Sequence, residues 1–120
     1  MRGLTILLTS DDAERLFSAL SIAAANAAAG GAARIFCEGL AVRTLIERTT
    51  ATQDQPRKAA GLPTLSQLRE EAAALGVVLI ACQGGMALAG LTIGRLGPDV
   101  EAGGLTSVMT SLGDDRLIAL

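Results

Sequence analysis

Histidine is absent from the sequence, and this absence excludes more chemistry than any other feature of the composition. Without histidine the chain cannot form a Ser-His-Asp or Cys-His catalytic group, or a zinc or iron site with imidazole ligands. Its two cysteines, Cys37 and Cys82, do not have the spacing of a metal-binding pair. We therefore expect no metal and no cofactor. The two thiols are the only side chains that can easily supply a nucleophile at neutral pH.

Tryptophan and tyrosine are missing as well, which leaves Phe17 and Phe36 as the only aromatic residues. The chain thus has no platform on which bases could stack, and its net charge of −2 does not attract phosphates. No apolar stretch reaches the roughly 20 residues of a membrane span, and the first apolar run is too short for a signal peptide. Two cysteines also make no disulfide framework in a domain of this size. We expect a cytoplasmic protein that binds neither nucleic acid nor membranes.

Short apolar runs alternate with segments of helical periodicity along the 120 residues, and half of all residues are hydrophobic. The expected strands cover residues 4–9, 33–37, 77–82, 100–102 and 117–120. The expected helices cover about residues 12–29, 40–46, 64–75, 84–91 and 105–112. Strands and helices that alternate in this way predict a single α/β domain over residues 1–120, with a parallel sheet and right-handed crossovers.

Two local features of the sequence carry more specific predictions. Asp11 precedes the first helix and Glu14 follows three residues later, a pattern that indicates a capping box with Asp11 as the N-cap. Residues 47–61 form the one long polar segment, in which threonine, glutamine, proline and charged residues interrupt the alternation. A connection of this length indicates a lid, a binding loop or a mobile insert.

A parallel sheet collects the carboxyl ends of its strands at one edge, here called the carboxyl edge, where open α/β sheets bind ligands. Cys82 ends a fully apolar run that we interpret as a central strand, and the Gly pair after it begins a helix of small residues. Backbone N–H groups at such a position favour a thiolate over a thiol. The groups expected at this edge are Asp11, Cys37, Glu38, Cys82, Gln83, Gly84, Gly85, Gly103 and Gly104.

The two thiols have different expected roles. Cys82 is either a moderate nucleophile, suited to thiol exchange or to holding a persulfide, or a small buried apolar residue. Cys37 precedes Glu38, whose negative charge disfavours a neighbouring thiolate, so we interpret Cys37 as structural. A disulfide between the two cysteines requires Cα atoms within roughly 7 Å, and the strand order that decides this is left open by the sequence.

With these residues considered together, the chain resembles the DsrE/DsrF-like (TusD-like) family of small sulfur-relay proteins over nearly its whole length. The most specific element of the resemblance is the cysteine that ends the third strand, followed by a small-residue helix and by a glycine eight residues later. The matching segments are residues 4–9, residues 23–31, residues 35–37, residues 79–82 with Met86, Gly90 and Leu91, and residues 102–105.

The resemblance implies a three-layer α/β/α sandwich with a mainly parallel five-stranded sheet, and homo- or hetero-oligomers, often trimers or hexamers, of which we expect a homo-oligomer. It also implies that Cys82 carries sulfur as a persulfide between a donor protein and an acceptor protein, a possible sulfurtransferase activity. In this hypothesis Gln83, Gly84 and Gly85 stabilise the charged sulfur, Asp11 and Glu38 shape the site, and the segment 47–61 covers it. Two alternatives are a non-catalytic oligomer that binds a small ligand or partner, and a thiol redox sensor that forms a Cys37–Cys82 or intersubunit disulfide.

Overall fold

The computed structural model describes residues 1–120 and has at its centre a five-stranded sheet in which every pair of neighbouring strands is parallel. The spatial order of the strands is β4-β3-β2-β1-β5. Their bounds are β1 Leu4–Leu8, β2 Ala33–Cys37, β3 Val78–Cys82, β4 Val100–Gly103 and β5 Arg116–Ala119. All five expected strands are therefore present, with their ends shifted by no more than one residue from the predicted positions.

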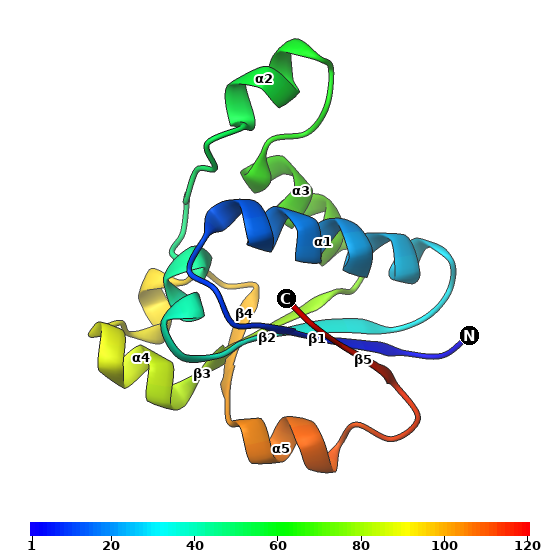
Figure 1. Cartoon of the computed structure of the whole chain (residues 1–120), viewed down its shortest axis with the longest axis vertical. Helices are drawn as coiled ribbons and strands as arrows, with labels where there is room; N and C mark the ends of the chain where they lie inside the picture. The colour runs from blue at the N-terminus through cyan, green and yellow to red at the C-terminus, as the bar shows by residue number, and fades with distance from the viewer.

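Helices cover both faces of the sheet, which confirms the expected α/β fold (Figure 1). The α-helices are α1 Ala13–Ala28, α2 Asp54–Ala59, α3 Leu65–Ala74, α4 Gln83–Ala89 and α5 Leu105–Thr110, and the 3₁₀ helices are η1 Gly39–Leu45 and η2 Ile93–Arg95. The α1 and α3 helices pack on one face, α5 lies on the other, and η1 and α4 lie together at the carboxyl edge. None of these helices combines the length and the hydropathy that crossing a membrane would require.

The face covered by α1 and α3 holds the main hydrophobic core. Because side chains alternate along a strand, Ile6, Ile35 and Leu79 project to this same face, and each is almost completely buried. From α1, Ala19 and Ala23 are fully buried against them. The methyl side chains of these alanines let the helix lie close to the sheet, which explains how a core with almost no aromatic residues fills its volume.

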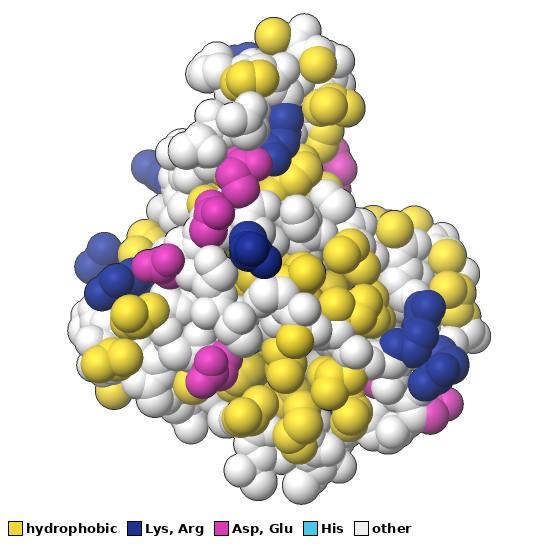
Figure 2. All heavy atoms as spheres, viewed as in Figure 1, with side chains coloured by type: hydrophobic (Ala, Val, Ile, Leu, Met, Phe, Trp, Pro, Cys, Tyr) yellow, Lys and Arg dark blue, Asp and Glu magenta, His cyan; other side chains and the backbone are white.

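The face covered by α5 is only partly closed, because that helix has six residues. In the carboxyl-terminal half of α5, the Arg34 guanidinium donates to the Val108 carbonyl at 3.0 Å and also to Thr5 Oγ1 at 2.8 Å, and it thereby ties α5 to the sheet. Figure 2 shows hydrophobic side chains gathered over this part of the molecule. We define the α5 patch by Leu105, Met109 and Leu117, which are 43%, 38% and 46% exposed.

The N-cap of the first helix lies one residue later than predicted. Asp12, and not Asp11, has the extended conformation of an N-cap, and its carboxylate accepts the Glu14 N–H at 2.9 Å. The predicted capping box is therefore wrong, since Asp11 lies outside the helix. Asp11 Oδ2 instead lies 3.8 Å from Arg43 Nη1, and the Glu14 side chain accepts from Arg57.

The polar segment 47–61 is more ordered than its composition suggests, since it contains the α2 helix. Arg57 holds this helix to α1 through two hydrogen bonds to Glu14 and through its stacking 3.5 Å above the Phe17 ring. The Arg57 hydrogen bond is also the main reason that the pKa of Glu14 is lowered. The Asp54 carboxylate then accepts the Leu65 N–H at 2.9 Å and so connects α2 to α3. Figure 1 shows α2 projecting beyond α1 and α3, apart from α4, so it does not cover the residues that follow β3.

Candidate functional site

Cys82 is the last residue of β3 and also the N-cap of α4, as its position between an apolar run and a Gly pair predicts. Its side chain is partly exposed. The strand is not central, however, because β3 is the neighbour of the outermost strand β4 and is followed in the sheet by β2. The sheet changes its direction of growth between β1 and β5. Cys82 is therefore at the carboxyl edge but away from the switch point where open α/β sheets usually bind ligands.

The sulfur of Cys82 is in contact with the backbone of the turn that follows it. Cys82 Sγ accepts the Gly85 N–H at 3.4 Å. A Cβ atom added at Gly84 would lie 3.9 Å from the same sulfur, an ordinary contact. Gln83 and Gly84 are exposed to solvent. The predicted Gln83-Gly84-Gly85 turn thus surrounds the thiol, with one N–H donor in place and an open side toward solvent.

Two of the predicted glycines are required by close packing around Cys82. A Cβ at Gly85 would overlap the carbonyl oxygen of Gly39, so this glycine lets α4 approach η1. Gly103 is the register partner of Cys82 on β4, and a Cβ there would lie 2.8 Å from Cγ2 of Ile80. Gly104 follows as the N-cap of α5. The sequence predicted that these glycines lie near Cys82 at the carboxyl edge, and the structure gives Gly85 and Gly103 a packing role there.

Cys37 lies on the neighbouring strand but is not brought to the same site. Its register partner on β3 is Ala81, so Cys82, the next residue, projects to the opposite face of the sheet. The Cys37 side chain is fully buried in the core under α1 and α3. Burial raises the pKa of its thiol to about 12, while the nearby Thr44 hydroxyl and the Arg69 charge lower it by less. A Cys37–Cys82 disulfide does not fit this geometry, which removes the intramolecular form of the redox-sensor hypothesis.

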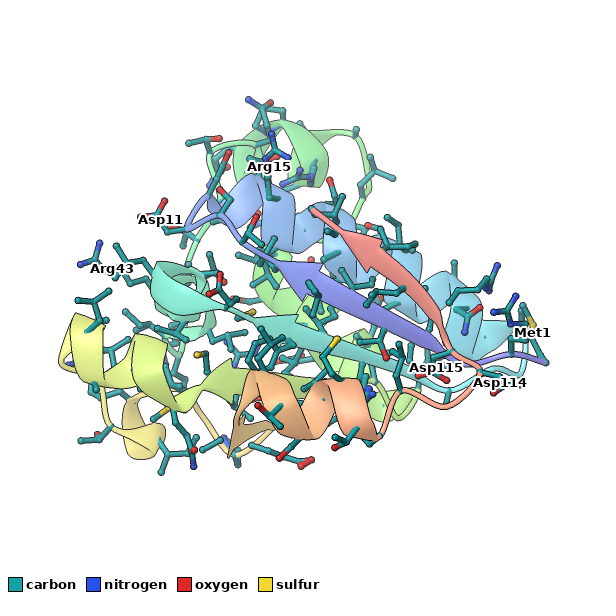
Figure 3. The ribbon with its side chains drawn as sticks, turned by 60° about the horizontal axis from the view of Figure 1, so that its bottom comes forward. Met1, Asp11, Arg15, Arg43, Asp114 and Asp115 are labelled. Carbon is teal, nitrogen blue, oxygen red and sulfur yellow. The ribbon has the colours of Figure 1, made fainter.

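The predicted acidic residues lie on the surface of the carboxyl edge. Asp11 and Arg43 form an exposed pair, and Figure 3 shows them together near α4, while Asp114 and Asp115 lie at the opposite edge. Glu38 is exposed directly after β2. Solvent screens such a pair, so it contributes little to stability, and its main effect is to place both signs of charge near the end of β2 and the start of α1.

A second feature of the structure was not predicted from the sequence. A hollow of about 490 Å³ lies on the α1 and α3 side of the sheet, between α3, the residues that follow η1, and the turn before β4. At its wall Arg69 donates to Asp99 at 2.7 and 2.8 Å and to the carbonyl of Leu45 at 2.8 Å. Burial alone would raise the pKa of Asp99, but the paired Arg69 guanidinium outweighs burial and the pKa is lowered. The two residues are 30 positions apart, and no local sequence pattern signals their contact.

Comparison with known proteins identifies the fold and nothing more specific. No family model and no curated protein matches the sequence. Among solved structures, the ychN protein from E. coli is similar with a TM-score of 0.76 and 20% sequence identity, over 100% of both chains. MTH1491 from Methanobacterium thermoautotrophicum, a protein of unknown function, is similar with a TM-score of 0.74 and 14% identity, again over 100% of both chains. Full coverage of both chains shows that the whole domain, and not only its sheet, has this architecture.

Proposed function

We propose that this chain is a DsrE-like sulfur carrier of the cytoplasm and that Cys82 holds the transferred sulfur as a persulfide. The observation that supports the proposal is the position of one thiol: Cys82 Sγ is partly exposed at the carboxyl edge and accepts the Gly85 N–H at 3.4 Å. The other thiol, Cys37, is sealed in the core. A reducing compartment keeps such an unpaired thiol available for exchange.

The transfer that we propose is a thiol exchange without net oxidation. The Cys82 thiolate attacks the outer sulfur of a donor persulfide, a new S–S bond forms, and the S–S bond of the donor breaks. The donor leaves as a thiolate, and Cys82 becomes a persulfide with a terminal S⁻ or SH group. In the second step an acceptor thiolate attacks that outer sulfur and Cys82 leaves as the thiolate. The exposed Gln83 and Gly84 leave space for the added atom.

The proposal includes three kinds of protein partner. A donor and an acceptor must each bring a sulfur atom to Cys82, which its open position after β3 permits. A further partner is a second copy of this chain, because we also propose a homo-oligomer, such as a trimer or hexamer. The α5 patch supports that part of the proposal, since Leu105, Met109 and Leu117 are large apolar side chains that remain exposed in the isolated chain.

Mass spectrometry of the intact, folded protein tests the proposal. After incubation with a persulfide donor, we expect the mass to increase by one sulfur atom, and peptide mapping should locate that atom on Cys82. The increase should disappear in Cys82→Ser and persist in Cys37→Ala, which is the matched control because it removes the buried thiol. The sulfur should then pass to an added thiol acceptor. A folded wild-type protein that gains no sulfur, or that gains it equally in Cys82→Ser, would contradict the proposal.

A further inference from the structure

The hollow beside α3 lies on the opposite side of the sheet from the face toward which Cys82 projects, so its role can be considered independently of sulfur transfer. Its volume of about 490 Å³ lies within the range of small-molecule sites. Three separate parts of the chain supply the exposed residues that line it, namely the residues after η1, the exposed side of α3, and the turn between η2 and β4. Its lining therefore combines residues that are distant in sequence.

Charged side chains of both signs line this hollow. Glu47, Arg48 and Glu70 line it, and none of them belongs to a salt bridge in the structure. A Cβ atom added at Gly97 would lie within 3.3 Å of Glu47 Oε2 and of both members of the Arg69–Asp99 pair. The Glu47 carboxylate is therefore close to that pair. With Arg69 and Asp99 included, the lining contains three carboxylates and two guanidinium groups.

The backbone of Arg48 is a second unusual feature at the same place. Arg48 is the only residue other than glycine with a positive φ, 67°, and it has no side-chain hydrogen bond that would compensate for this conformation. Such conformations are concentrated at functional sites, where the surrounding structure holds a side chain in a required position. Here the strained residue is one of the charged residues that line the hollow.

The chemistry of the lining restricts the ligand. Ala73 and Pro98 provide exposed apolar surface, and no aromatic residue lines the hollow, so an aliphatic stem fits better than a ring that needs stacking. Glu47 and Glu70 attract a cationic amine and repel phosphate. Arg48 attracts a carboxylate, and Arg69 uses four of its five N–H donors within the protein, which leaves one for a ligand.

We infer that this hollow binds a small aliphatic compound that carries both an ammonium group and a carboxylate, of the size of a basic amino acid. The ammonium group binds Glu47 and Glu70, the carboxylate binds Arg48, and the stem lies on Ala73 and Pro98. Such a site would make the chain a binding protein for an amine-bearing metabolite in addition to its proposed sulfur chemistry, and neither role requires the other.

A titration followed by NMR of the isotope-labelled full chain tests the inference. The probe is L-lysine, and two analogues serve as controls: 1,5-diaminopentane lacks the carboxylate and hexanoate lacks the amine. We expect lysine to cause saturable shifts at the amides of Glu47, Arg48 and Gly97, without shifts at Gly85 beside Cys82. Diaminopentane should bind more weakly, and hexanoate should not bind.

Variants on the two sides of one helix sharpen the test. Glu70→Gln should weaken lysine binding about fivefold, as expected for the loss of one solvent-accessible charge contact, and Glu71→Gln, which lies outside the hollow, should not change it. Arg48→Gly should reduce lysine affinity to that of diaminopentane, and its fold is not at risk because glycine accepts a positive φ. Absence of saturable shifts, equal binding of hexanoate, or equal effects of Glu70→Gln and Glu71→Gln would overturn the inference.

Discussion

The two faces of the sheet differ in how completely they are covered, and each face holds one of the two cysteines. Under α1 and α3, Cys37 lies in a continuous aliphatic core with no exposed surface. On the other face α5 spans only six residues, the α5 patch remains exposed, and Cys82 is partly accessible at the carboxyl edge. Two chemically identical side chains, at the ends of neighbouring strands, are thereby given opposite environments.

The difference arises from one step in strand register. Cys37 is paired with Ala81, and a strand directs successive side chains to opposite faces. Had Cys82 been one position earlier, its thiol would have entered the core beside Cys37. Because a one-residue shift exchanges the two faces of a strand, Cys82 is accessible owing to its register in the sheet, and not merely because it is the last residue of its strand.

The largest expected effect of this contrast is in the rates at which the two thiols react. Burial raises the pKa of Cys37 from 9.0 to about 12, which lowers its thiolate fraction at neutral pH about a thousandfold. We expect iodoacetamide to label Cys82 in the folded protein and to leave Cys37 unlabelled until the protein is denatured. Peptide mapping by mass spectrometry measures both rates. Comparable labelling of the two thiols under native conditions would contradict the difference in burial between Cys37 and Cys82.

A smaller effect is expected in the alkaline pH dependence of stability. The Cys37 thiol ionises near pH 9 in the unfolded chain but only near pH 12 in the folded one, so folding retains a proton that unfolding releases. The contribution of Cys37 to stability should therefore be constant below pH 9 and then fall by about 1.4 kcal/mol per pH unit as pH rises toward 12. Urea denaturation from pH 8 to 11 measures this slope. The absence of tyrosine and the single lysine keep competing titrations few.

The control for this experiment is Cys37→Ala, studied in a Cys82→Ala background so that no thiol titrates. Its stability should not show the additional loss above pH 9. An identical alkaline slope with and without Cys37 would show that another group is responsible, and would contradict the assignment of the buried thiol.

The smallest expected effect on the isolated chain concerns the exposed face. Leu117→Gln changes a side chain that is 46% exposed, so it should alter the free energy of unfolding of a single chain by less than about 0.5 kcal/mol. If the α5 patch joins copies of the chain, the same substitution should lower the molar mass measured by light scattering. Leu75→Gln, at a residue 47% exposed beyond the end of α3, is the matched control and should leave the mass unchanged. Equal masses for the wild type and Leu117→Gln would exclude this surface as the contact.

Much of the fold was predictable, because its determinants are local. Uninterrupted apolar runs identified the buried strands, and Gly30 and Gly76 marked the ends of helices where the chain takes positive φ values of 103° and 86°. Cys82 was also placed correctly at the end of a strand before a helix. Each of these features depends on residues within a few positions of one another.

The remainder could not be predicted, because it depends on contacts between distant segments. The α2 helix is held by Arg57 and Glu14, which are 43 residues apart, and so composition alone made this segment resemble a loop. The choice of Asp12 over Asp11 as the cap depends on where the chain turns, since both side chains can accept the same N–H. Nor does local sequence determine strand order, which decides that Cys37 and Cys82 are neighbours facing away from each other.

The pairing of β1 with β5 has a consequence for how the molecule forms. Arg116 donates its backbone N–H to Gly3, and Thr5 donates to Asp115 at 2.8 Å, so the first strand is completed by residues 110 or more positions later. Loop closure over such a distance is slow, and until it occurs β1 presents an unpaired apolar edge. A folding intermediate that lacks β5 could therefore accept the last strand of another copy, which makes strand exchange between chains the characteristic misfolding route of this topology.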